Sequence, residues 1–141
     1  MNSKLSFKKS ITAGLYAGAV AAIINAILFF IFHSAGIISD NILPKPNEPL
    51  TVVPVIMASI IPLIIGSILF FLFEKFTNKG FLIFYIVAVV FVLLSLISPF
   101  TVIQDVTVGY ALILCVMHIV SAAVLLYFLS KSLQSISRTN N

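Results

Sequence analysis

Residues 52–73 read VVPVIMASIIPLIIGSILFFLF, an unbroken apolar run without Asp, Glu, Lys or Arg. At 1.5 Å per residue, an α-helix of this length covers about 30 Å, the thickness of the hydrocarbon core of a bilayer. A membrane β-strand would be about half as long and would alternate in polarity. The run therefore predicts a transmembrane α-helix, which satisfies its backbone polar groups within one segment.

Three further runs, 11–34, 81–100 and 107–129, also lack charged residues. Together they predict an all-α protein, an antiparallel four-helix transmembrane bundle that forms a single domain over residues 1–141. A loop over residues 36–51 is the only long connection. The first run follows basic residues, as a signal peptide does, but it exceeds the usual ~7–15 apolar residues, so we expect it to be retained.

The composition excludes most soluble alternatives. Of the 141 residues, 61% are hydrophobic and only 9% are charged, whereas soluble domains are about 45–50% apolar and roughly 25% charged. The lipid bilayer is thus the expected solvent and partner, and no nucleic acid is expected. The single cysteine, Cys115, excludes an internal disulfide and a CxxC motif. We expect no cofactor and no metal site.

The basic residues predict the orientation. With the N-terminus inside, seven Lys and Arg residues lie on the cytoplasmic side and only Lys45 lies outside. Short loops rich in Lys and Arg stay in the cytoplasm. We therefore expect both termini in the cytoplasm and the protein in the bacterial inner membrane. The seven are Lys4, Lys8, Lys9, Lys75, Lys79, Lys131 and Arg138.

Two polar residues fall near the middle of their runs, Asn25 in the first and His118 in the fourth. Because hydrocarbon leaves such groups unsatisfied, we expect them to face the bundle interior and to form a hydrogen bond, directly or through water. Two interpretations stay open. The pair is either interhelical glue worth about 0.6–2 kcal/mol, or part of a proton path or ligand site.

Small residues and prolines predict packing features. The stripe of Gly14, Gly18 and Ala22 allows close approach of another helix, in the same chain or in a second copy as a homodimer. Pro62, with Ala58 and Gly66 four residues away on either side, predicts a kink and a packing face. Pro99 predicts a second kink and introduces a turn over residues 101–106. The Pro62 kink is either architectural or part of a site.

The predicted outer mouth gathers polar residues. His33, Asp40, Glu48 and Asp105 lie at the outer ends of the runs or in the outer loop. Such a group either coordinates a cation or consists of ordinary solvated loop ends. Pro44, Pro46 and Pro49 stiffen the 36–51 loop, which is either a cap over the bundle mouth or a plain linker.

Three phrases carry a resemblance to a known family: AAIINAILFF over residues 21–30, LLSLISPF over 93–100 and VMHIVSAAV over 116–124. Together they resemble a bacterial family of small four-helix integral membrane proteins with a domain of unknown function. The resemblance implies the fold and no activity.

The functional hypotheses follow from these features. We expect a non-enzymatic accessory or binding component with a lipid or membrane-protein partner. The alternative is a small transporter or ligand carrier with a midplane cavity near Asn25, Pro62 and His118. An enzyme is disfavoured, because no nucleophile and base stand at a workable spacing.

Overall fold

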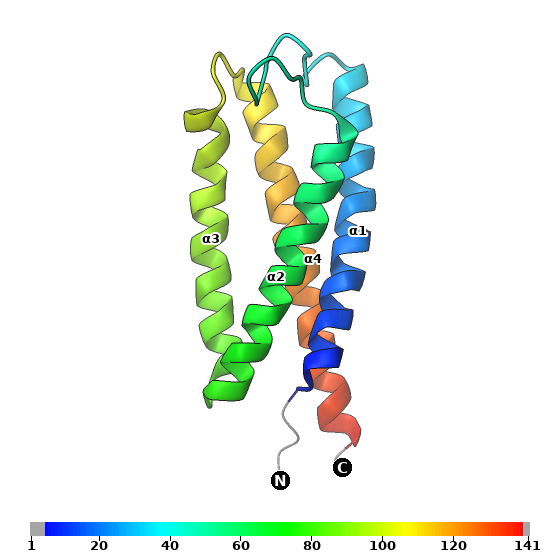
Figure 1. The fold of residues 1–141 in the computed structure, drawn as a ribbon, viewed down its shortest axis with the longest axis vertical. Helices are drawn as coiled ribbons and strands as arrows, with labels where there is room; N and C mark the ends of the chain where they lie inside the picture. The colour runs from blue at the N-terminus through cyan, green and yellow to red at the C-terminus, as the bar shows by residue number, and fades with distance from the viewer. Residues whose placement is uncertain (1–4, 140–141) are drawn as a thin grey trace.

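A computed structural model describes residues 5–139, with side chains described through residue 135. Its helices are α1 (Phe7–Ser34), α2 (Val52–Phe76), α3 (Gly80–Val102) and α4 (Val108–Thr139), arranged as one bundle (Figure 1). The predicted all-α four-helix bundle is confirmed, and each helix is long and apolar enough to cross a membrane. Both termini and the α2–α3 connection lie at one end of the bundle, which we call the terminal end (Figure 1). The α1–α2 and α3–α4 connections lie at the opposite end, which we call the loop end.

The helix bounds differ from the predicted runs mainly at their ends. The α1 helix begins at Phe7 rather than 11, because the Ser6 hydroxyl accepts a hydrogen bond from the Lys9 backbone N–H at 3.3 Å and caps the first turn. The α4 helix continues to Thr139, where the apolar run had predicted an end at 129. Polar residues continue this helix once its apolar part has begun it.

The predicted turn after Pro99 requires a correction. Helix α3 passes through Pro99 and ends at Val102. A proline inside a helix removes only the hydrogen bond to the carbonyl four residues earlier, here that of Ser95, so the remaining bonds carry the helix past it. In the last turn of α3, Thr101 Oγ1 donates to the Ile97 and Ser98 carbonyls, both at 3.3 Å.

Most of the core comes from α1, α2 and α4, and α3, the least buried of the four helices, contributes Phe84. An apolar cluster at the terminal end includes Ala21, Leu63 and Leu125. A second cluster at the loop end includes Phe29, Val55 and Met117, together with Ile38 and Ile42 from the 36–51 loop. The loop is therefore packed onto the bundle by its apolar side chains.

Helices α1 and α2 approach each other closely at the small residues of α1. A Cβ on Gly14 would lie 2.6 Å from Ser67 Cβ, and one on Gly18 would lie 3.2 Å from Ile60 Cα. Ala22 is also buried. Gly14 and Gly18 of the stripe thus pack against α2 of the same chain.

Candidate functional site

Asn25 of α1 is the centre of a buried polar group that joins three helices. Its side-chain Nδ2 lies 2.9 Å from Ser59 Oγ of α2, 3.0 Å from Ser121 Oγ of α4 and 3.3 Å from the Met117 carbonyl oxygen. The serine hydroxyls donate to the Val55 and Met117 carbonyls of their own helices. Their lone pairs are therefore available to accept from the amide. We call Asn25, Ser59 and Ser121 the polar layer.

The polar layer lies between the two apolar clusters in all three helices. Four residues separate Asn25 from Ala21 on one side and from Phe29 on the other. Ser59 lies in the same way between Val55 and Leu63. Ser121 does so between Met117 and Leu125. A single hydrogen-bonded layer within an otherwise apolar core fixes the register of the helices, since any slip would leave these polar groups unpaired.

One acceptor of the layer remains open. Asn25 Oδ1 is buried and has no hydrogen-bond partner within the described part of the chain. Turning the amide over would place this oxygen against the Met117 carbonyl oxygen, which is repulsive. The observed orientation, with Nδ2 toward its three acceptors, is therefore the favourable one.

His118 lies outside the polar layer. Its side chain is exposed, and its Nδ1 lies 2.7 Å from the carbonyl oxygen of Leu114, one turn earlier in the same helix. The predicted direct hydrogen bond between Asn25 and His118 is therefore wrong. Met117 and Ser121 face Asn25, and His118, one residue beyond Met117, is rotated by about 100° around the helix axis.

The two predicted kink residues both lie inside helices, Pro62 in α2 and Pro99 in α3. Pro62 is exposed and Pro99 is buried. Because proline has no N–H, the Ala58 carbonyl, four residues before Pro62, lacks its usual helical donor. Gly66 packs internally, since a Cβ there would lie 2.9 Å from Leu125 Cδ2 of α4.

At the loop end the structure brings together two of the four predicted mouth residues. His33 Nε2 lies 3.0 Å from Asp40 Oδ1, and the two side chains are 38% and 66% exposed. Glu48 instead closes a turn through its backbone N–H to the Lys45 carbonyl. Asp105 occupies the α3–α4 turn with a φ of 55°. No group of three or more potential metal ligands forms within residues 5–139.

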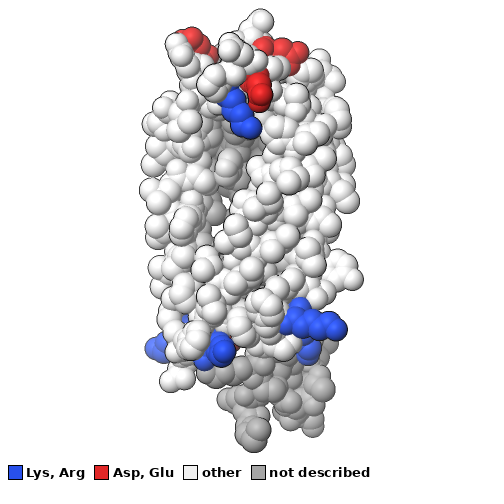
Figure 2. Space-filling model, viewed as in Figure 1, with Lys and Arg blue, Asp and Glu red and all other residues white. Residues whose placement is uncertain are grey.

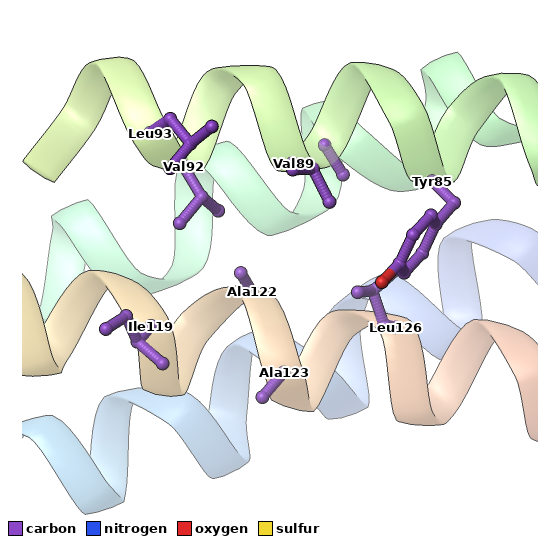
Figure 3. Close-up of a pocket in the computed structure, with 9 residues that line it drawn as sticks. Tyr85, Val89, Val92, Leu93, Ile119, Ala122, Ala123 and Leu126 are labelled. Atoms are coloured by element: carbon purple, nitrogen blue, oxygen red, sulfur yellow. The ribbon is translucent and has the colours of Figure 1, made fainter.

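An apolar groove of about 220 Å³ lies between α3 and α4. Tyr85 reaches from α3 toward Leu126 of α4 at one end, and the small side chains of Ala122 and Ala123 form part of the α4 wall (Figure 3). The lining residues are Tyr85, Ala88, Val89, Val92 and Leu93 of α3 and Ile119, Ala122, Ala123 and Leu126 of α4. The groove is hollow because two alanines of α4 stand opposite a helix that packs only loosely.

A comparison with known families matches most of the chain. The family model "Family of unknown function (DUF6069)" covers residues 6–135. The chain belongs to this family. The match and the four-helix apolar bundle confirm the resemblance carried by the three phrases. Comparisons with curated proteins and with solved structures found no match.

The carrier alternative for this DUF6069 chain required Asn25, Pro62 and His118 to line one cavity. Asn25 is 2% exposed within the polar layer, whereas Pro62 and His118 are exposed, and the α3–α4 groove is lined by none of the three. The sequence analysis did not identify Ser59 or Ser121 as partners of Asn25. A serine midway along an apolar run, at the depth of Asn25, is the signal that would have indicated Ser59.

Proposed function

We propose that this protein is a non-enzymatic accessory component of the bacterial inner membrane that holds a lipid acyl chain in the groove between α3 and α4. Its helices would cross the bilayer four times in antiparallel order, with both termini in the cytoplasm. The single observation that carries the proposal is the apolar groove itself, which is partly open and bordered by the least buried helix of the bundle.

The distribution of charge supports the orientation. On the face in Figure 2, basic side chains gather at the terminal end, and acidic side chains gather at the loop end with one basic residue among them. Lys8, Lys9, Lys75, Lys79 and Lys131 flank the terminal ends of the helices. Short basic segments remain in the cytoplasm, so the terminal end is the cytoplasmic end in this proposal.

The depth of the groove suits an acyl chain of the cytoplasmic leaflet. Tyr85 lies five residues into α3, roughly 8 Å from its start at 1.5 Å per residue, and Leu93 lies roughly 20 Å from it. The headgroup of such a lipid would lie beside the lysines of the terminal end, which attract anionic lipids at about 1 kcal/mol each. Aliphatic and aromatic carbon makes up almost the whole wall of the groove, which matches a hydrocarbon chain.

We propose no catalytic role because of the side chains found in the polar layer and the groove. The polar groups of the polar layer are mostly engaged with each other, and their helix-bound hydroxyls are not activated by a neighbouring base. Neither the groove nor the polar layer places a nucleophile beside a base.

The groove is tested by a small-to-large substitution with a matched control. Ala123→Leu adds bulk to an exposed position of the groove, and Ala19→Leu makes the same change at an exposed position of α1. Native mass spectrometry of gently solubilised protein should find bound phospholipid in the wild type and in Ala19→Leu, and much less in Ala123→Leu. Equal lipid occupancy in all three would overturn the proposal.

The orientation is tested by cysteine labelling in a Cys115→Ala background. A membrane-impermeant maleimide added to intact cells with a permeabilised outer membrane should label Asn41→Cys and not Lys79→Cys. The opposite pattern would reverse the topology and place the groove in the other leaflet.

A further inference from the structure

His118 occupies an unusual place on α4. Ala111 and Leu125 lie seven residues before and after it, on the same face of the helix, and they are 0% and 7% exposed. His118 between them is exposed. The buried face of α4 is therefore interrupted at this one level, where the bundle opens to its surroundings.

Helix α2 lies close to α4 near this level, because Asn25 contacts both Ser59 of α2 and Ser121 of α4. Leu125 packs against Gly66, which anchors the two helices to one another. Along the axis of α4 toward the loop end, His118 lies roughly 10 Å from Leu125. Along α2 in the same direction, Pro62 and Ala58 lie roughly 6 Å and 12 Å from Gly66. Ala58 and Pro62 are both exposed. We call His118, Ala58 and Pro62 the His118 opening.

The His118 opening presents hydrogen-bond acceptors and lacks donors. A carbonyl oxygen only accepts, so the contact with Leu114 places the proton of the neutral ring on Nδ1. Nε2 is then an acceptor, and no partner for it lies within the described part of the chain. The Ala58 carbonyl is a second acceptor, because Pro62 has no N–H. In hydrocarbon, an acceptor without a donor costs free energy.

We propose that the His118 opening is the docking site of a transmembrane helix from another protein, which donates a hydrogen bond to His118 Nε2 from an Asn, Gln, Ser or Thr side chain. This rests on the proposed membrane insertion and is independent of the lipid groove. The small side chains of Ala58 and Pro62 let a helix backbone approach closely, and one polar contact then adds to the packing, as in other membrane helix pairs.

Other occupants match the opening less well. A second copy would bring its own His118, whose Nε2 is also an acceptor, so two copies related by a two-fold axis would have no proton to share there. Lipid headgroups lie about 15 Å from the bilayer midplane and therefore do not reach the His118 opening. A small ligand needs a pocket that encloses most of its surface, whereas His118 lies on an open face outside the α3–α4 groove.

The test uses a designed helix as the probe. The full-length protein is reconstituted in phosphatidylcholine vesicles with a fluorescent poly-leucine peptide of membrane-spanning length, carrying either one central Asn or none. Energy transfer to a donor on the protein should indicate about three- to thirty-fold tighter binding of the Asn peptide, the range expected for interhelical hydrogen bonds in bilayers. The preference should disappear in His118→Leu and persist in His118→Gln, because the Gln side-chain oxygen accepts at the Nε2 position.

A second measurement guards against indirect effects. The ¹⁵N chemical shift of His118 Nε2 should move toward that of a hydrogen-bonded acceptor when the Asn peptide is added and should stay unchanged with the all-Leu peptide. Protease protection of the loops verifies that each variant is inserted, so a failed insertion is distinguished from failed docking. Equal binding of both peptides to correctly inserted protein would overturn the inference.

Three further results would contradict it. A preference that survives in His118→Leu would place the contact elsewhere. Energy transfer between two labelled copies that depends on His118 would assign the opening to a homodimer. The same Nε2 shift produced by 1-dodecanol alone, without the peptide, would assign it to a small hydroxylated ligand.

Discussion

Asn25 Nδ2 of α1 and Ser59 Oγ of α2 lie 2.9 Å apart in the middle of the bundle, and both residues are 2% exposed. This contact, together with those to α4, joins three helices at one level. Helix α3 takes no part in this contact. The bundle therefore combines a core of α1, α2 and α4, aligned by a polar layer, with a more loosely packed α3 that leaves a groove against α4.

The polar layer predicts a difference between the two mid-helix polar residues. Asn25→Leu should lower the free energy of unfolding by about 1–2 kcal/mol, because it removes three donor contacts and leaves two serines without their donor. His118→Leu should change it by less than about 0.5 kcal/mol, since His118 bonds only to its own helix. Reversible unfolding in mixed micelles measures both. An equal loss in the two variants would contradict the assignment of Asn25 alone to the core.

The α1–α2 contact predicts a substitution that can be rescued. Gly14→Ala should destabilise the protein by about 1–3 kcal/mol, because the new Cβ would overlap Ser67 Cβ. Adding Ser67→Gly removes the overlapping atoms and should recover part of the loss. Thermal unfolding of the single and double variants in detergent gives the comparison. A double variant less stable than the sum of both single effects would show that the contact is not steric.

Two glycines at different contacts should differ in their tolerance of alanine. A Cβ on Gly80 would lie 2.5 Å from the backbone N and Cα of Glu74, which belong to α2 and move only with the helix. A Cβ on Gly66 would meet the end of the Leu125 side chain, which can change rotamer. Gly80→Ala should therefore lower the melting temperature more than Gly66→Ala. The reverse order would mean that the α2–α3 turn is more adaptable than its geometry indicates.

The 36–51 loop should be held by its apolar residues rather than by the His33–Asp40 contact. Ile38 is 1% exposed within the loop-end cluster, whereas His33 and Asp40 are in contact with solvent. Exposed ion pairs contribute about 0–1 kcal/mol, so Asp40→Ala should leave the loop resistant to limited proteolysis. Ile38→Ser should make it readily cleaved. Rapid cleavage of Asp40→Ala with protection of Ile38→Ser would contradict this view of the loop.

The sequence determined by itself that the chain forms four helices, where the apolar part of each one lies and at which end the basic residues gather. These properties depend on run length, apolar content and the positions of Lys and Arg, all of which are local. The need for a buried partner at Asn25 was also predictable, because an amide in hydrocarbon is costly wherever it lies.

Only the tertiary structure decided which side chains meet. The sequence predicted His118 as the partner of Asn25, whereas Ser59 and Ser121 fill that role and His118 is exposed. Soluble helices reveal their buried face through a polar face opposite to it. Helices that are apolar on all sides carry no such signal, so the rotation of each helix about its axis depends on the packing of small residues such as Gly14 and Gly66 against their neighbours.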